Sequence, residues 1–249
     1  MLTEERYQEI LLELEEKGLV TVQELTQRLD ASESTIRRDL TELEHRGKLS
    51  KIHGGAKSLD VQFSTMDVEM AVRNDLNQSE KMIIGKYAAN LIQPNDFVFI
   101  DAGSTTEKLV EAIQETRCTY VTNSMMHGKR LADKGCKVYI LGGEVKERTE
   151  AIVGEEAVSS LGKYNFTIGF WGTNAVTGTH GFTTPDVSEA SVKQKAMKQT
   201  KQCYVLCDAS KFNQVSPVQF AEFQDAIIIT DKLTDESYRK YKNILEVDA

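Results

Sequence analysis

Residues 32–57 read SESTIRRDLTELEHRGKLSKIHGGAK, and this stretch predicts a helix followed by a short hairpin. Ser32 is a good N-cap, because its side-chain oxygen can accept a hydrogen bond from an otherwise unpaired N–H of the first turn. Ile36, Leu40 and Leu43 recur at i, i+4 and i+7 and form one apolar stripe. Burial of that stripe would hold the helix and leave its opposite face open for contact with a partner.

The opposite face and the hairpin are polar and basic. Residues 34–57 hold six basic and three acidic side chains in a chain whose net charge is -8, so positive charge is concentrated here. From Lys48 to Lys57, polar and apolar residues alternate around Gly54-Gly55, as in a small β-hairpin. A solvated amphipathic helix is the simpler interpretation of such a helix alone. The candidate DNA contacts are Ser32, Ser34, Thr35, Arg37, Arg38, Lys51 and His53.

The residues upstream favour the DNA-binding interpretation. Apolar residues at helical spacing between Tyr7 and Leu14 mark a first helix, which Gly18 would end. Thr21 and Glu24 form the ends of a capping box that opens a second, short helix. Three helices followed by a β-wing within about 57 residues make a winged helix-turn-helix, whose third helix enters the major groove of DNA.

This segment resembles the N-terminal domain of the DeoR family of bacterial sugar-metabolism repressors. The resemblance rests on the combination SxxTIRRDLxxLExxG followed by HGGA, which is more specific than a helix-turn-helix alone. The matching stretches are ERYQEILLELEEKG, TVQELTQRLDASESTIRRDLTELEHRG and LSKIHGGA.

Composition and length place the chain among ordinary two-domain proteins. Its 249 residues, 40% hydrophobic and 27% charged, suffice for a DNA-binding domain over residues 1–57, a linker over residues 58–77 and a larger domain over residues 78–249. No run of about 18 apolar residues occurs, and acidic residues stand where a signal peptide needs basic and apolar ones. We therefore expect a cytoplasmic protein without a membrane partner.

The four cysteines predict neither a disulfide nor a metal site. Cys203 and Cys207 lie in CYVLC, which is typical of a buried strand, and a separation of four residues in a strand places them about 13 Å apart. Neither a bridge nor a shared metal fits that distance. We expect the thiols to be structural or incidental, and we expect no metal and no cofactor.

After residue 77 the pattern changes to short apolar runs that alternate with helical segments. Continuous apolar runs are typical of a parallel sheet covered on both faces, so we predict a Rossmann-like α/β domain. The predicted strands are Phe97 to Ile100, Thr119 to Thr122, Val138 to Leu141, Phe166 to Trp171, Tyr204 to Cys207, Ala226 to Thr230 and Ile244 to Val247. The predicted helices lie near residues 83–92, 105–115, 125–133, 155–161, 188–201 and 235–241.

In such sheets the ligand site lies at the carboxyl ends of the strands. Gly103 would let the backbone approach a ligand, and Ser104, Thr105 and Thr106 offer hydroxyls and N–H groups at a helix start, where the dipole favours an anion. A phosphate is the predicted occupant, although a plain strand-to-helix turn would explain this motif alone. The other strand ends carry Asn123, Asn174 and Asp208.

Several cations could contact a phosphate at that edge. Lys211 closely follows the sixth apolar run, and Arg73 and Lys81 lie at the entry to the domain. Lys193, Lys195, Lys198 and Lys201 lie on one predicted helix, where a solvated face is the favoured interpretation. Lys193 would then pair with Glu189 at i, i+4.

The larger domain also resembles the DeoR family, through the motifs DAGSTT, VTNS, LGGEV followed by VG, GTNAV and DASKF. In that family this domain is a sensor that resembles ribose-5-phosphate isomerase and binds a phosphorylated sugar or related metabolite. The resemblance implies a phosphate loop at Gly103, Ser104, Thr105 and Thr106. It also implies polyol or phosphate contacts at Asn123, Asn174, Asp208 and Lys211, with Arg73 and Lys81 as further candidates.

The resemblance implies an oligomeric repressor of a sugar-utilisation operon that is released from DNA by a phosphosugar, with fructose 1-phosphate as the first candidate. In the opposite mechanism, the same ligand would act as a corepressor and strengthen DNA binding. The alternative is a phosphosugar isomerase with a fused DNA-binding domain. Many family members have an Asp in the segment that here reads Gly172-Thr173-Asn174-Ala175, and an Asn cannot act as the general base of an aldose–ketose isomerisation. We therefore expect no enzymatic activity.

Overall fold

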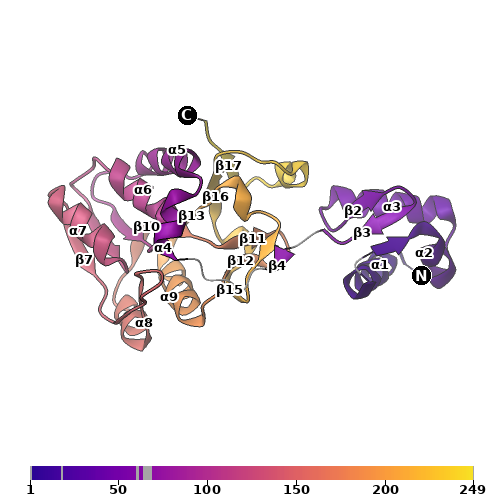
Figure 1. Cartoon of the computed structure of the whole chain (residues 1–249), viewed down its shortest axis with the longest axis horizontal. Helices are drawn as coiled ribbons and strands as arrows, with labels where there is room; N and C mark the ends of the chain where they lie inside the picture. Colours follow the sequence, from indigo (N-terminus) through magenta and orange to yellow (C-terminus); the bar gives the residue numbers. More distant parts are fainter. Residues whose placement is uncertain (1, 18, 60–61, 64–68, 249) are drawn as a thin grey trace. The chain divides into compact units, whose positions relative to one another are not determined.

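The computed structural model describes residues 2–17, 19–59, 62–63 and 69–248 (Figure 1). These residues form two compact units, residues 1–62 with 235–240 and residues 63–234 with 241–249. Gly18, predicted to end the first helix, lies outside the described residues. So do residues 60–61 and 64–68 of the predicted linker.

The first unit is a winged helix-turn-helix, as predicted. Its elements in chain order are α1 (Thr3–Lys17), β1 (Leu19–Thr21), α2 (Val22–Leu29), α3 (Glu33–His45), β2 (Ser50–Ile52) and β3 (Gly55–Lys57). Helix α2 begins at a complete capping box of Thr21 and Glu24. Strand β1, which the sequence did not predict, pairs antiparallel with β3, so the wing belongs to a three-stranded sheet in the order β1-β3-β2.

This unit has its own hydrophobic core. Ile10 of α1, Leu25 of α2 and Ile36 of α3 are fully buried against one another, together with Leu49 and Ala56 beside the wing. Each residue of the predicted stripe on α3 lies in this core. The stripe therefore fixes which face of α3 is turned outward.

The second unit is built on seven parallel strands, confirming the predicted α/β class. The strand order is β17-β16-β13-β10-β5-β6-β7. All seven apolar runs predicted from the sequence are the strands of this sheet, to within four residues at each end. They are β5 (Phe97–Ile100), β6 (Thr119–Thr122), β7 (Lys137–Ile140), β10 (Phe166–Gly172), β13 (Thr200–Leu206), β16 (Ile227–Thr230) and β17 (Ile244–Glu246).

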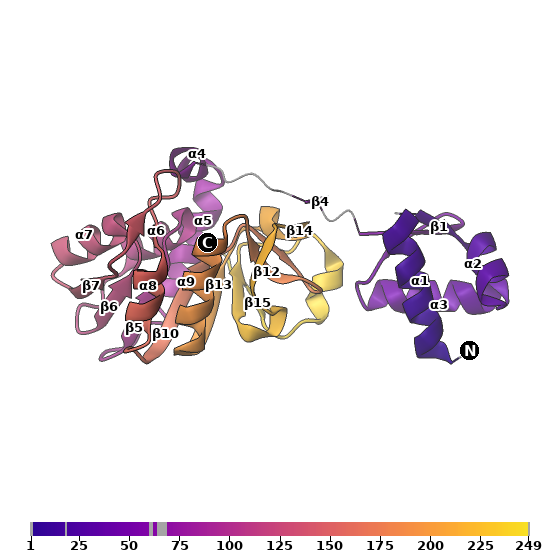
Figure 2. The same cartoon turned by 90° about the horizontal axis from the view of Figure 1, so that it is seen from below.

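Helices cover both faces of the sheet (Figure 1). Apolar residues of α5 (Gln78–Ala89), α6 (Ser104–Ala112) and α7 (Met125–Asp133) pack with strand residues in one core on the first face. Helices α8 (Glu155–Leu161) and α9 (Val187–Lys198) contact each other on the opposite face, where Figure 2 shows them side by side. The predicted helix near residues 235–241 is a 3-10 helix, η3 (Glu236–Lys240).

Shorter elements lie around the sheet. Helix α4 (Met70–Asp75) falls within the segment predicted as a linker, so part of that segment is helical. A three-stranded antiparallel sheet, which the sequence did not predict, has the order β11-β12-β15. The remaining bounds are β11 (Ala175–Thr177), β12 (Gly181–Thr184), β15 (Val218–Ala221), β8 (Glu144–Val145), β9 (Ile152–Val153), β4 (Gln62–Phe63), β14 (Gln214–Val215), η1 (Ala209–Lys211) and η2 (Phe223–Asp225).

All four cysteines are free thiols, as predicted. Cys118, Cys136 and Cys207 are buried and Cys203 is half-buried. Burial raises the pKa of Cys203 to about 12, because a thiolate is poorly solvated there. This thiol is therefore protonated at neutral pH.

Candidate functional site

The predicted DNA-contact residues of α3 lie together on its outward face. Ser34, Arg37 and Arg38 are exposed, and Thr35 is half-buried. Ser32 is the N-cap of the helix, since its Oγ accepts from the backbone N–H of Thr35 at 3.3 Å. The face therefore presents two guanidinium groups and several hydroxyls, which are the groups that contact phosphates and base edges.

Charge pairing decides which cations of this unit remain available. Asp39 is buried and accepts from the Arg6 guanidinium of α1, so the acidic residue of RRD is neutralised inside the unit. Arg46 donates to Glu42 at 2.9 Å and to Glu4 at 3.1 Å. Because it is paired with two carboxylates, it adds less to the net positive charge of residues 34–57. Within the described residues the guanidinium of Arg38 makes no ion pair or hydrogen bond.

The wing continues the same surface. Lys51 and His53 are exposed, and Lys51 Nζ donates to Thr41 Oγ1 of α3 at 2.8 Å. Gly54 has a φ of 83°, a conformation that favours glycine, and a Cβ at Gly55 would lie 2.1 Å from the Val20 carbonyl oxygen of β1. The two glycines of HGGA therefore have different roles. Gly54 allows the turn of the wing, and Gly55 allows the wing to pack closely against β1.

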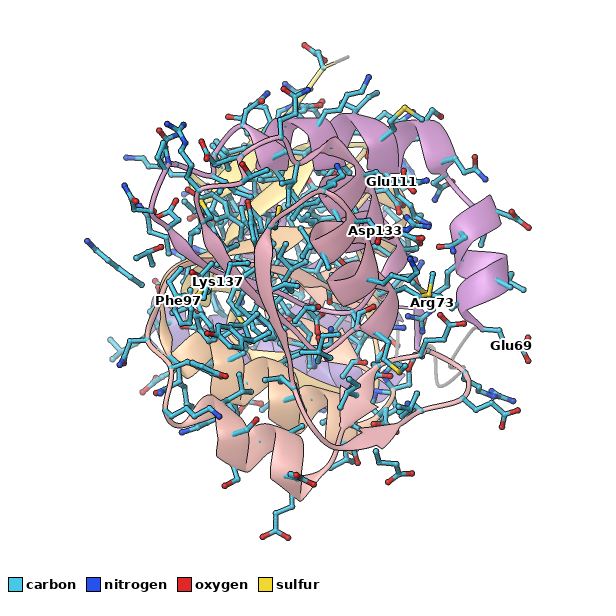
Figure 3. All side chains as sticks on the ribbon, turned by 90° about the vertical axis from the view of Figure 1, so that its left-hand side faces the viewer. Glu69, Arg73, Phe97, Glu111, Asp133 and Lys137 are labelled. Carbon is cyan, nitrogen blue, oxygen red and sulfur yellow. The ribbon has the colours of Figure 1, made fainter. Side chains whose placement is uncertain are left out.

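A pocket of about 190 Å³ lies beside the carboxyl ends of β5 and β10 in the second unit. Its walls are the turn from β5 into α6, the turn after β10, the segment around η1, and helices α4, α5 and α9. Figure 3 shows Arg73 on the side of α4 that faces the body of the unit, with Glu69 farther out. The residues lining it are Met70, Arg73, Leu76, Asn77, Lys81, Ala102, Gly103, Ser104, Thr105, Thr149, Gly172, Thr173, Asn174, Glu189, Lys193, Ser210, Lys211, Gln214 and Ser216.

The structure brings most of the predicted ligand-binding residues to this pocket. Those that line it are Gly103, Ser104, Thr105, Asn174, Lys211, Arg73 and Lys81. Gly103 is the N-cap of α6, so the following N–H groups begin a helix whose dipole favours a bound anion. The hydroxyls of Ser104 and Thr105 stand at the same point.

Three predicted ligand-binding residues do not line the pocket. Thr106 is fully buried and its Oγ1 donates to the Gly103 carbonyl at 2.9 Å. Asn123 Oδ1 accepts from the Ala102 N–H at 2.8 Å. Asp208 caps η1 and its Oδ1 accepts from Asn77 Nδ2 at 3.0 Å. These three side chains hold the loops that form the wall.

The pocket collects positive charge. Lys81 is 4% exposed, and its ammonium donates to the Arg73 carbonyl. Burial lowers the pKa of Lys81, the nearby Lys211 and Arg73 lower it further, and Asp208 opposes them. An anion in the pocket would compensate these crowded cations.

The sequence interpretation of Lys193 is wrong. We predicted a solvated side chain paired with Glu189, whereas Lys193 is 4% exposed and its ammonium pairs with the buried carboxylate of Asp101 at the end of β5. The ammonium also donates to the Gly172 carbonyl at 3.2 Å. The available signal was that Val192 and Ala196 place this position on the apolar side of α9.

Glu189 is the second pocket residue that sequence reasoning missed. Its Oε1 accepts from Thr149 Oγ1 at 2.6 Å and from Lys146 Nζ at 3.0 Å. Burial raises the pKa of Glu189, but Lys193, Thr149 and Lys146 together outweigh that effect and hold it below its ordinary value. The pocket therefore contains an ionised carboxylate as well as its cations.

Two further features are absent from the described residues. No group of three or more His, Cys, Asp or Glu side chains within residues 2–17, 19–59, 62–63 and 69–248 is placed to hold a metal ion. In the same residues, none of the helices has the length and apolar character needed to cross a bilayer.

Comparison with known proteins agrees with both parts of the molecule. Residues 6–62 match the DeoR-like helix-turn-helix domain, and residues 76–232 match the DeoR C terminal sensor domain. The chain is 42% identical over 252 residues to the uncharacterized HTH-type transcriptional regulator FruR of Bacillus subtilis (strain 168), with 99% of each chain covered. It is 33% identical over 247 residues to the lactose phosphotransferase system repressor of Staphylococcus aureus (strain NCTC 8325 / PS 47), with 98% of each covered.

Among solved structures, ribose 5-phosphate isomerase A from Methanocaldococcus jannaschii aligns with 55% of this chain and 55% of its own, at 16% identity and a TM-score of 0.42. The matches to both domains and the relatives that span the whole chain all point to the same assignment. The chain belongs to the DeoR family of helix-turn-helix transcriptional regulators.

Proposed function

We propose that this regulator represses a sugar-utilisation operon by binding operator DNA through α3 and the wing, and that a phosphorylated sugar in the pocket releases it. The S. aureus relative is named a repressor of a sugar phosphotransferase system, which supports the operon class. The alternative of an isomerase gains no support from the two relatives, because both are named regulators or repressors. Such a repressor acts in the cytoplasm.

One observation carries the effector proposal: Lys81, Arg73 and Lys211 line the same polar pocket as Gly103, Ser104 and Thr105 at the N-terminus of α6. Backbone N–H groups at a helix start and several ammonium or guanidinium groups are the usual partners of a phosphate. The pocket also offers hydroxyl and amide side chains, such as Thr173 and Asn174, for sugar hydroxyls. A C3 to C6 sugar phosphate combines both kinds of group.

The proposed ligand contacts are the members of the predicted set that line the pocket, while Thr106, Asn123 and Asp208 support its wall. Fructose 1-phosphate is the first candidate, followed by tagatose 6-phosphate and other hexose phosphates. Release requires that the ligand bind the low-affinity state more tightly than the operator-bound state, because equal affinity for both states shifts nothing. A corepressor would show the opposite preference.

We also propose that the protein works as a homo-oligomer, which places two recognition helices in successive major grooves of an inverted repeat. The proposed parts are a DNA-binding domain over residues 1–57, a connecting segment over residues 58–77 and a sensor domain over residues 78–249. Because Arg73 lines the pocket, the connecting segment contributes directly to effector binding in this scheme.

The experiment that tests the proposal is fluorescence anisotropy of the full-length protein on the DNA upstream of its own operon. A panel of sugar phosphates is titrated at fixed salt, since salt alone changes such affinities strongly. We expect one sugar phosphate to release the DNA while its unphosphorylated parent does not. DNA binding that no member of the panel changes would reject the effector assignment, and absence of DNA binding would reject the repressor.

A further inference from the structure

The charged groups of the pocket fall into two clusters of opposite character. The first, which we name the cationic end, consists of Lys81, Arg73 and Lys211 with the buried Asp208 beside them. Among these four groups three positive charges lie near one carboxylate, and Asp208 also accepts from Asn77 and the Ser210 N–H. This cluster of four groups therefore has a net positive charge.

The second cluster, which we name the acidic end, consists of Glu189, Lys193 and Asp101 with Lys146 and Asp186. Lys193 is neutralised by Asp101 in a buried ion pair. Lys146 is shared, because its Nζ lies 3.1 Å from Asp186 and 3.0 Å from Glu189. Among these five side chains two ammonium groups face three carboxylates, so the cluster itself has a net negative charge.

Glu189 is the group of the acidic end that is placed to meet a ligand. Its side chain lines the pocket, while both of its side-chain hydrogen bonds, from Thr149 and Lys146, go to Oε1. Among the described residues, no group donates a hydrogen bond to Oε2. An ionised carboxylate oxygen accepts strongly from hydroxyl groups and cannot donate to a phosphate oxygen.

We infer that Glu189 is a specificity-determining residue that accepts a hydrogen bond from a hydroxyl of a sugar monophosphate and excludes sugar bisphosphates. In this arrangement the single phosphate occupies the cationic end, and the rest of the sugar extends toward Glu189. A second phosphate at that position would place like charges together in a low-dielectric pocket. The inference rests on the proposed function, because it assigns the two ends of the same effector site.

Isothermal titration of the full-length protein tests the inference. The probes are fructose 1-phosphate, fructose 6-phosphate, tagatose 6-phosphate, fructose 1,6-bisphosphate and inorganic phosphate. We expect at least one monophosphate to bind at least about tenfold more tightly than the bisphosphate. Inorganic phosphate should bind weakly to the cationic end alone.

The decisive variant is Glu189→Gln, which keeps the shape of the side chain and removes its charge. We expect it to bind the monophosphate about tenfold more weakly, since a hydrogen bond to a charged group is lost. Its affinity for the bisphosphate should stay the same or rise, and its affinity for inorganic phosphate should not fall. Glu147→Gln, an exposed change of the same chemistry in the segment that carries Lys146, is the matched control and should behave as the wild type.

The outcomes separate this inference from the function on which it rests. Tight monophosphate binding with an equally tight bisphosphate, or an unchanged preference in Glu189→Gln, would overturn the role of Glu189 and leave the effector site in place. A loss of every probe, inorganic phosphate included, in Glu189→Gln would show a merely structural role and also overturn it. If no sugar phosphate bound the wild type, the inference and the proposed effector would both fall.

Discussion

Arg38 and Asp39 are neighbours in the sequence, but about 100° of helical rotation separates their side chains on α3. Arg38 is exposed, whereas Asp39 is 4% exposed and paired with Arg6. The basic residue is thus available to a partner, and the acidic residue is neutralised beneath it. A carboxylate on the same face would have repelled a DNA phosphate.

Arg38→Ala should weaken operator binding by about 1 to 3 kcal/mol if Arg38 makes a bidentate contact with a base. The measurement is fluorescence anisotropy on operator and on scrambled DNA at several salt concentrations. Lys129→Ala, which removes one exposed positive charge from α7, is the control and should leave the affinity unchanged. Retained affinity and sequence preference in Arg38→Ala would remove this residue from the reading face.

His127 makes the stability of the protein depend on pH. It is 1% exposed, and burial lowers its pKa to about 3, so it stays neutral in the folded chain at pH 5. The unfolded chain takes up this proton below a pKa of about 6.5, so stability falls as the pH falls from 6.5 toward 3. At pH 5 the loss is about 2 kcal/mol relative to pH 7.5.

We expect urea unfolding of the wild type at pH 5.0 and 7.5 to show this loss, and His127→Leu to show a difference smaller by about 2 kcal/mol. An equal pH dependence in the two proteins would mean that His127 takes up its proton in the folded state. The comparison between pH values matters more than the absolute stability of the variant, because the substitution also changes the packing.

Some residues of the candidate site could be predicted from the sequence, and others could not. Gly103, Ser104 and Thr105 were predictable because a glycine and hydroxyls after an apolar run identify a strand-to-helix turn. Lys193 and Glu189 were not, since charged residues on a helix are usually solvated. Their burial depends on Asp101 and Lys146, which lie 92 and 43 residues away. Apart from the apolar neighbours of Lys193 on α9, the three-dimensional pairing that keeps these charges buried leaves no local pattern in the sequence.

At the scale of elements, the wing depends on two adjacent glycines with different constraints. Gly55→Ala should destabilise the first unit by about 1 to 3 kcal/mol, because the new methyl group would overlap the backbone of β1. Gly54→Ala meets no atom within 4 Å, and only its positive φ opposes it, at about 1 kcal/mol. Urea unfolding of residues 1–62 would measure both, and a larger loss for Gly54→Ala would contradict the assigned roles.

The short helix η1 links two predicted ligand residues. Lys211 lines the pocket directly, whereas Asp208 caps η1 through the Ser210 N–H at 3.0 Å. We expect Lys211→Ala to weaken the response to the sugar phosphate by at least about tenfold, because a charged hydrogen bond is lost. Asp208→Ala should also blunt the response, because the cap that positions Lys211 is removed.

Both variants should still bind operator DNA with wild-type affinity in the anisotropy assay. Lys201→Ala, an exposed change on β13, is the matched control. A normal sugar-phosphate response in both Lys211→Ala and Asp208→Ala would place the effector site elsewhere.

The elements that could be predicted are those whose packing leaves a local pattern. Each strand of the seven-stranded sheet contains a short apolar run, and in the central strands β5, β10 and β13 most residues of that run are buried because helices cover both faces of the sheet there. Strands β11 and β12 were missed because AVT and GFTT are short, rich in threonine and separated by a turn. Strand β1 was missed for a similar reason, since its three residues lie between two helices and are defined by pairing with β3.

At the scale of the whole molecule, the proposed repressor needs its sensor domain for tight DNA binding as well as for sensing. A fragment of residues 1–62 contains the complete core of the first unit and should fold. We expect it to bind operator about 100-fold more weakly than the full chain, because the oligomer that couples two half-sites is lost. Anisotropy on the same DNA, with circular dichroism to verify folding, would measure this. Equal affinity would contradict the oligomer.

During synthesis, the core of the first unit is complete long before the last strands of the large sheet have been made. The core of the winged helix is complete once residue 56 has emerged, whereas β16 and β17 come from residues 227–246. At about 5 to 20 residues per second, roughly 10 to 40 s of synthesis lie between these points, and domains fold in the order of their emergence. The first unit of a nascent chain can therefore fold well before the proposed sensor domain can.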